Sequence, residues 1–334
     1  MHNEGEYPGS YHVLGNLWKL SSESLPRYRE HISLHLRGEG LMLAAMNRRH
    51  FLNFAVPFAA TSAFAIEPLK RAGQPRLLTS LAAYSFRDTF QKEPEKLDMF
   101  KFIDYCADQG LAGAEVTSYY FPKDADDAYF LKLKRHAFLR GVAISGTAVG
   151  NNFAHPKGEA RDKEIASVRQ WIDRAALMGA PHIRVFAGSP PKGTSNEEAI
   201  ASCIEALDEC AELAAKRGIF LGVENHGGIV AEPEALLHII QSVQNPWLGI
   251  NLDTGNFHTD DPYAALAQCA PYAVNVQVKV EISPKGKGAE PTDFTKLGKI
   301  LRDANYQGYV ALEYESKPDP WTVIPDFLTK LKAL

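Results

Sequence analysis

From residue 78 to the C-terminus, short apolar runs alternate eight times with longer amphipathic segments. The runs have the length of β-strands, and the segments between them repeat apolar residues at helical spacing. Such alternation predicts parallel strands that are joined by crossover helices. The runs interpreted as strands are 78–86, 113–119, 142–149, 182–187, the start of 219–228, 248–253, 273–280 and 309–315.

Eight strand–helix pairs predict an α/β fold of the (β/α)₈ TIM barrel type, as a single domain over residues 78–332. An open, doubly wound sheet is the alternative. Such a sheet usually has fewer units and carries a Gly-rich phosphate-binding turn after its first strand. Residues 84–88 contain no glycine, so the barrel is favoured.

Residues 46–65 are predicted to be a twin-arginine-type signal peptide. Arg48 and Arg49 precede a short apolar stretch, which ends in an Ala-x-Ala sequence at 63–65 that is typical of a cleavage site. The sequence therefore predicts export to the periplasm by the twin-arginine route. The alternative is an N-terminal amphipathic helix of the domain itself.

The apolar stretch of this segment is too short to span a bilayer, so we expect no stable membrane anchor after cleavage. Signal peptides begin close to their charged region. Residues 1–45 are therefore interpreted as a non-native or disordered N-terminal extension, with Met46 or Met42 as the natural start.

The net charge and the cysteine spacing argue against a nucleic-acid partner and against a cysteine-based zinc or redox site. The formal net charge is −4, which argues against a nucleic-acid partner. The four cysteines form no Cys-x-x-Cys pair, so neither a zinc motif nor a redox motif is expected. A small-molecule sugar or keto-sugar is the expected partner, and the sequence is compatible with a homo-oligomer.

Four polar side chains fall on four consecutive predicted strands, the fifth to the eighth: Glu224, Asp253, Gln277 and Glu313. Each interval is about one strand–helix unit long, so all four are expected along one arc of the barrel mouth, where TIM barrel enzymes carry their active sites. Three carboxylates and one amide oxygen suit a hard divalent cation. A cation would also relieve the mutual repulsion of clustered acids. The alternative is that these are ordinary polar residues at strand ends.

Four motifs resemble the xylose isomerase-like TIM barrel family of sugar and sugar phosphate isomerases and epimerases. They are Val-Glu-Asn-His at 223–226, Leu-Asp-Thr-Gly-Asn at 252–256, Val-Gln-Val-Lys at 276–279 and Leu-Glu-Tyr-Glu at 312–315. The resemblance implies one divalent metal ion that is held by Glu224, Asp253, Gln277 and Glu313. Mn²⁺ is the expected ion, and Mg²⁺, Co²⁺ and Zn²⁺ are alternatives.

The resemblance further implies a metal-dependent isomerase or epimerase of a sugar or small hydroxyketone. Reaction would pass through a cis-enediolate, with Glu224 and Glu313 as the acid/base pair. A keto-inositol or keto-sugar dehydratase, which is a lyase, is one alternative. A non-catalytic, exported carbohydrate-binding barrel is another, although a pair of opposed carboxylates favours catalysis.

Five further residues are candidate substrate contacts: His226, Lys279, Asn256, His155 and Arg184. Lys279 follows Gln277 by two residues and so shares its inward face on an extended chain. Structural alternatives exist for these side chains. A loop histidine bonds backbone, a lysine extends to the rim, and Arg184 is expected to pair with Glu115 inside the barrel.

Overall fold

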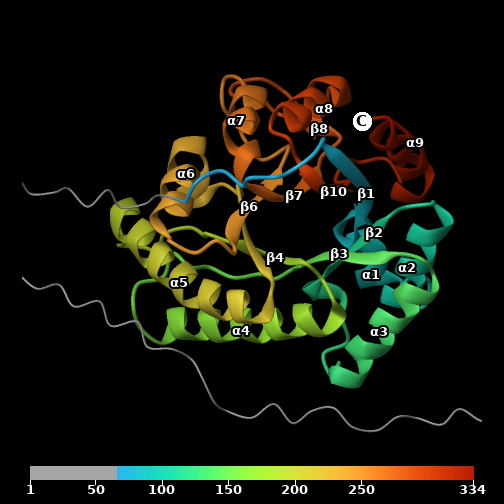
Figure 1. Ribbon diagram of the computed structural model, residues 1–334, viewed down its shortest axis with the longest axis horizontal. Helices are drawn as coiled ribbons and strands as arrows, with labels where there is room; N and C mark the ends of the chain where they lie inside the picture. Colours follow the sequence, from blue (N-terminus) through green and yellow to red (C-terminus); the bar gives the residue numbers. More distant parts are fainter. Residues whose placement is uncertain (1–65) are drawn as a thin grey trace, which may run out of the picture. The chain divides into compact units, whose positions relative to one another are not determined.

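The computed structural model describes residues 66–334, and eight parallel strands of this part close into a barrel (Figure 1). The predicted TIM barrel is therefore confirmed. The predicted signal peptide and N-terminal extension lie outside the described residues. In chain order the barrel strands are β1 (Arg76–Ala82), β2 (Gly113–Thr117), β3 (Ala143–Ala148), β4 (His182–Phe186), β5 (Phe220–Glu224), β6 (Leu248–Asp253), β7 (Ala273–Val278) and β10 (Gln307–Leu312).

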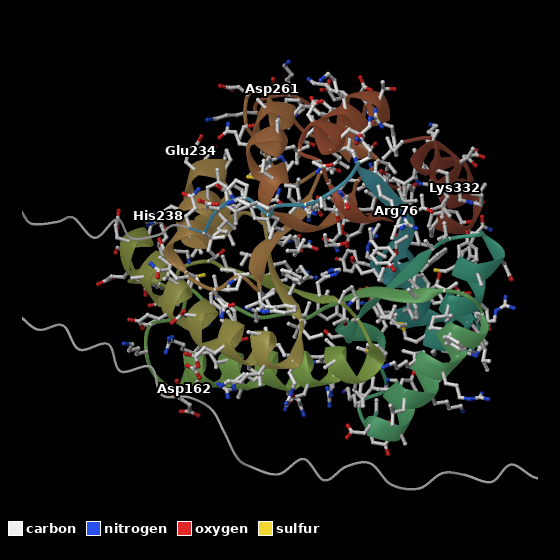
Figure 2. All side chains as sticks on the ribbon, viewed as in Figure 1. Arg76, Asp162, Glu234, His238, Asp261 and Lys332 are labelled. Carbon is white, nitrogen blue, oxygen red and sulfur yellow. The ribbon has the colours of Figure 1, made fainter. Side chains whose placement is uncertain are left out.

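Helices follow every barrel strand and cover the outside of the barrel (Figure 1). They are α1 (Arg87–Lys92), α2 (Met99–Asp108), α3 (Asp127–Leu139), α4 (Glu159–Met178), α5 (Asn196–Arg217), α6 (Pro233–Ser242), α7 (Pro262–Cys269), α8 (Phe294–Asp303) and α9 (Pro320–Lys332). Charged residues such as Asp162 on α4 and Lys332 on α9 lie on their outer faces (Figure 2). In residues 66–334, no helix combines the length and apolarity needed to cross a membrane.

Local sequence fixes where the helices begin and end. The Ser195 side chain accepts from the Glu198 N–H, and the Glu198 carboxylate accepts from the Ser195 N–H, which together form a capping box at the start of α5. Gly218 ends this helix with a φ of 68°, a left-handed conformation that favours glycine. The chain then turns directly into β5, whose last residue is a candidate site residue.

The parallel strands bring their C-terminal ends to one mouth of the barrel. Glu224 and Asp253 are the last residues of β5 and β6, and Glu313 follows β10 directly. The predicted eighth strand, 309–315, is too long at its end. Pairing with β7 ends at Leu312, which lies opposite Val278, and the Tyr314 N–H donates to Ser85 Oγ after β1 at 2.9 Å.

Polar side chains fill the barrel interior beneath the mouth. Asn275 Nδ2 donates to Glu115 Oε2 at 2.7 Å and to Asn251 Oδ1 at 2.8 Å. Gln277 Nε2 donates to Glu115 Oε1 at 2.6 Å, and Asn251 Nδ2 donates to Gln277 Oε1 at 2.6 Å. His182 Nε2 lies 3.9 Å from Glu115 Oε2. We call Glu115, His182, Asn251, Asn275 and Gln277 the interior polar layer.

A short antiparallel hairpin stands outside the barrel, after β7. It pairs β8 (Glu281–Ile282) with β9 (Glu290–Pro291). Backbone and side-chain bonds tie the hairpin to the mouth: Thr292 Oγ1 donates to the Lys279 carbonyl at 2.8 Å, and the Lys285 N–H donates to the Thr259 carbonyl at 2.9 Å. The hairpin therefore forms one wall of the mouth without belonging to the barrel.

Candidate active site

Glu224 is held by two side chains from either side. Arg184 on β4 places its Nε 2.9 Å from Glu224 Oε2, and Asn256 Nδ2 donates to Glu224 Oε1 at 2.9 Å. The guanidinium is itself fixed by the Val149 carbonyl at 3.0 Å and by the Phe186 ring, whose centroid lies 3.9 Å away. Burial raises the pKa of Glu224 to about 7, although Arg184 opposes the shift.

The expected pairing of Arg184 with Glu115 is wrong. Both residues point into the barrel, but His182 lies at the level of Glu115, two residues before Arg184 on the same strand. The longer arginine side chain instead reaches the mouth and pairs with Glu224. Arg184 is thus a positioning residue for the candidate acid/base carboxylate in this structure.

Asp253 is fixed through its backbone by the neighbouring strand. The Asn225 side chain accepts from the Asp253 N–H at 2.8 Å and donates to the Asp253 carbonyl at 2.9 Å. Asp253 Oδ1 accepts from the Gly255 N–H at 2.8 Å. Within residues 66–334 the buried Oδ2 has no hydrogen-bond partner, and the ammonium of Lys279 lies 3.1 Å from it. One oxygen of this carboxylate is therefore available to a cation.

Lys279 lies between three carboxylates, one at the end of β6 and two in the segment after β10. Its Nζ is 2.9 Å from Glu313 Oε2, 3.1 Å from Asp253 Oδ2 and 3.1 Å from Glu315 Oε2. We call these four residues the lysine cluster. Burial works to raise the pKa of Glu313, but the adjacent ammonium outweighs burial and lowers it. The Lys279 backbone is fixed because its N–H donates to Thr254 Oγ1 at 2.9 Å.

Gln277, a predicted metal ligand, belongs to the interior polar layer. Its oxygen accepts from Asn251 and its nitrogen donates to Glu115. The amide thus points toward the barrel interior, whereas Lys279, two residues later, reaches the carboxylates at the mouth. The structure brings Glu224, Asp253 and Glu313 to the mouth, and the ligand role of Gln277 stays a prediction.

The candidate substrate contacts are placed differently from one another. Asn256 and Lys279 line a cavity at the mouth. His226 packs against the Phe186 ring with their centroids 4.6 Å apart, and burial lowers the pKa of this histidine. His155 is partly buried on the loop after β3, and within residues 66–334 no hydrogen bond links it to the carboxylates.

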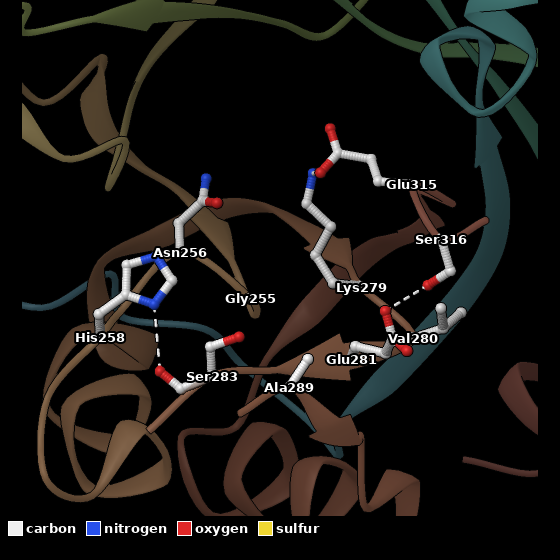
Figure 3. Close-up of a pocket in the computed structure, with 10 residues that line it drawn as sticks. All are labelled: Gly255, Asn256, His258, Lys279, Val280, Glu281, Ser283, Ala289, Glu315 and Ser316. Carbon is white, nitrogen blue, oxygen red and sulfur yellow. Dashed lines mark hydrogen bonds and ion pairs between the residues drawn. The ribbon is translucent and has the colours of Figure 1, made fainter. Parts of the chain in front are cut away.

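A cavity of about 320 Å³ opens beside the lysine cluster (Figure 3). Its walls come from the ends of β6, β7 and β10 and from the hairpin. Sequence reasoning missed Glu281, His258, Ser283 and Glu315 in this lining. Glu315 had a usable signal, because it follows Glu313 by two residues in the Leu-Glu-Tyr-Glu motif and shares its face on an extended chain.

The donor chemistry of the mouth suits a divalent metal ion. Glu224, Asp253 and Glu313 supply hard oxygens, and the unbonded Asp253 Oδ2 is a ready ligand atom. As the side chains stand, residues 66–334 contain no group of three His, Cys, Asp or Glu placed closely enough to hold a metal ion. The ammonium of Lys279 lies between two of the carboxylates instead.

Comparison with known proteins decides the family. A family model described as a xylose isomerase-like TIM barrel matches residues 103–331, which is more than half of the chain. The chain belongs to this family. The resemblance in its four strand-end motifs is thereby confirmed at the level of the family. All four motifs lie inside the matched range.

The similar proteins differ widely from this chain in sequence. A putative hydroxypyruvate isomerase of Mus musculus is 26% identical over 233 residues, which cover 63% of this chain and 82% of that protein. The crystal structure of 3-keto-D-glucoside 4-epimerase from E. coli matches with a TM-score of 0.60 and 18% identity, over 78% of this chain and all of that one (100%). D-psicose 3-epimerase from Clostridium cellulolyticum H10 matches with a TM-score of 0.59 and 16% identity, over 70% and 84% of the two chains. At these identities the two structures show the shared fold.

Proposed function

We propose that this family member is an isomerase or epimerase of a sugar or small hydroxyketone, acting through a cis-enediolate. The observation that carries the proposal is the pair Glu224 and Glu313, two buried carboxylates whose pKa values are shifted in opposite directions. Such a split is the usual mark of an acid and a base in one site. The names of the relatives, a hydroxypyruvate isomerase and two epimerases, support the same reaction class.

The Lys279 ammonium lowers the pKa of Glu313, and a divalent cation in its place would favour the same ionised form, so Glu313 is the proposed base. Glu313 takes the proton from the carbon beside the substrate carbonyl, and the electron pair of that bond forms the enediolate. Glu224, whose pKa is about 7, is the proposed acid, which delivers a proton to the opposite face of the same carbon or to the neighbouring carbon. The first course is epimerisation, and the second is isomerisation with transfer of the hydroxyl proton between the two oxygens.

Cationic groups of the chain stabilise this reaction. The Lys279 ammonium lies 2.9 Å from Glu313 and is placed to stabilise negative charge on an enediolate oxygen. Arg184 orients Glu224. A divalent ion, Mn²⁺ in our proposal, would supply Lewis-acid polarisation of the carbonyl when held by Glu224, Asp253, Gln277 and Glu313. Arg184, Asn256, His226 and His155 are the proposed contacts for substrate hydroxyls.

Deuterium exchange tests the reaction. The full chain with Mn²⁺ is incubated in deuterated buffer with hydroxypyruvate, D-fructose or D-psicose, and carbon-bound deuterium is followed by NMR. We expect incorporation by the wild type and its loss in Glu313→Gln, whereas Glu209→Gln on exposed α5 is the matched control. A dehydrated product would favour the lyase alternative. Binding of these compounds without exchange would favour the non-catalytic barrel.

The proposed metal is tested by elemental analysis and thermal unfolding. At a free Mn²⁺ concentration of 100 times Kd, binding to the folded state adds about 2.7 kcal/mol to the free energy of unfolding. This corresponds to a rise in Tm of about 5 °C for a chain of this size. A chelator should reverse the rise, and Glu224→Gln/Glu313→Gln should lack it. An unchanged Tm in wild type at millimolar Mn²⁺ would contradict the metal proposal.

Export by the twin-arginine route is also a proposal, which rests on the sequence of residues 46–65. It is supported by Arg48 and Arg49 before the apolar stretch. Replacing both with lysine keeps the charge and should retain the chain in the cytoplasm, as judged by cell fractionation. Equal periplasmic amounts of the two forms would contradict the proposal.

A further inference from the structure

The lysine cluster contains one ammonium and three carboxylates, and these carboxylates are not equivalent. Asp253 and Glu313 are buried and are proposed metal ligands, with side chains 0% and 7% exposed. The Glu315 side chain is 42% exposed and opens to the cavity. Figure 3 shows the tip of Lys279 beside the Glu315 carboxylate. The ammonium thus contacts two inner carboxylates and one outer carboxylate.

The backbone and stem of Lys279 are fixed, whereas its ammonium has an additional partner in Glu315. The Lys279 N–H donates to Thr254 Oγ1, and its carbonyl accepts from Thr292 Oγ1. Gly255 packs so closely on the stem that a Cβ there would lie 2.6 Å from Lys279 Cγ. The Nζ, three bonds further along a flexible stem, is already 3.1 Å from Glu315. A short movement of the tip alone would therefore leave it paired with the outer carboxylate.

A divalent cation and this ammonium compete for the same oxygens. Two cations within about 4 Å of each other repel strongly in a partly buried site. A metal ion on Asp253 and Glu313 therefore requires the ammonium to leave them. Without another partner, the buried ammonium would be left uncompensated, which is costly. Glu315 provides that partner at a distance that the structure already shows.

We propose that Lys279 is the resident counter-ion of the metal-free site, and that Glu315 retains its ammonium when a divalent cation takes Asp253 and Glu313. This inference rests on the proposed metal dependence. It assigns Glu315 a role in metal exchange, although it lies outside the predicted ligand set. It also places the ammonium at the cavity wall in the metal-bound state, where substrate hydroxyls would meet it.

The test is Mn²⁺ affinity, measured by calorimetry on the full chain without substrate. The variants are Lys279→Met, Glu315→Gln and the double variant. We expect Lys279→Met to bind Mn²⁺ about tenfold or more tightly than wild type, because a competing charge is removed. Glu315→Gln should bind about threefold to tenfold more weakly. In the Lys279→Met background the same Glu315→Gln change should alter affinity less than about twofold, because there is no ammonium to retain.

Glu281→Gln is the matched control, because Glu281 lines the same cavity and its carboxylate bonds to Ser316. A general loss of negative charge would weaken binding equally in Glu281→Gln and Glu315→Gln, and would act equally with and without Lys279. Either result would overturn the inference. The Glu315 side chain is substantially exposed, so this arm remains informative should Lys279→Met fail to fold.

The outcomes also separate this inference from the proposed function. Absence of Mn²⁺ binding in wild type and in Lys279→Met would refute the proposed metal centre, and the inference with it. Binding by wild type that Lys279→Met does not tighten would refute the inference alone. Thermal unfolding of the metal-free variants gives a second readout. Lys279→Met should lower the Tm of the metal-free chain and gain more from Mn²⁺ than wild type does.

Discussion

Two buried groups in the interior polar layer should give the folding stability opposite pH dependences. Burial, which outweighs the amide hydrogen bonds, raises the pKa of Glu115 from 4.5 to about 7. Between these values the folded state holds the proton more tightly, so stability falls as pH rises from about 4.5 to 7. Burial lowers the pKa of His182 from 6.5 to about 4, so this histidine makes stability rise as pH increases from about 4 to 6.5. Each shift corresponds to about 3 kcal/mol.

The two slopes oppose one another between about pH 4.5 and 6.5, so their contributions in the wild type should nearly cancel. Glu115→Gln removes one of them. Relative to wild type, its stability should increase by about 3 kcal/mol between about pH 4.5 and 7, which is about 5 °C in Tm. Relative to wild type, His182→Asn should show the opposite trend, a fall between about pH 4 and 6.5.

The assay is thermal or urea unfolding of the full chain at half-unit pH steps, with each variant referred to wild type. Glu209→Gln on the exposed face of α5 serves as the control for loss of a carboxylate. The reasoning is refuted if Glu115→Gln follows the wild-type pH profile within error. Such a result would mean that Glu115 is ionised in the folded state, with its charge balanced inside the barrel.

Three further substitutions test how the site is held. Asn225→Ala removes both side-chain hydrogen bonds to the Asp253 backbone and should lower the free energy of unfolding, measured in urea, by about 2 to 4 kcal/mol. A smaller loss would mean that these two bonds are not needed to fix the ends of β5 and β6. Gly146→Ala would place a Cβ 2.0 Å from His182 Cε1, so a loss of about 3 kcal/mol or failure to fold is expected, and normal stability would contradict this packing. Arg184→Met should cost about 3 to 5 kcal/mol at neutral pH and less under acidic conditions that protonate its partner; a pH-independent loss would contradict the ion pair.

The alternation of apolar runs and amphipathic segments was enough to predict the barrel, because each strand–helix unit has its own local pattern. The same pattern located Glu224 and Asp253, since a polar residue at the end of a buried strand has only the mouth to face. Depth along the barrel axis was harder to predict. Alternation places Gln277 and Lys279 on one face, but the Gln277 amide bonds inside the barrel while the Lys279 ammonium is at the mouth.

Partners of long side chains were also beyond the sequence. Arg184 shares its inward face with His182, and only the three-dimensional layers show that His182 takes the place beside Glu115. The lysine cluster forms where the ends of β6, β7 and β10 come together. A single sequence does not show which side chains of these strand ends are in contact. Glu315 is the exception, because its spacing from Glu313 marks it as a residue of the same face.

The β8–β9 hairpin lines the cavity but is not part of the closed barrel sheet. Its two strands pair with each other, and it contributes Glu281, Ser283 and Ala289 to the cavity while the barrel closes without it. The hairpin can therefore be exchanged or lengthened with little expected disturbance to the closed sheet. It is the natural segment to randomise in a library that seeks new substrates on an unchanged scaffold.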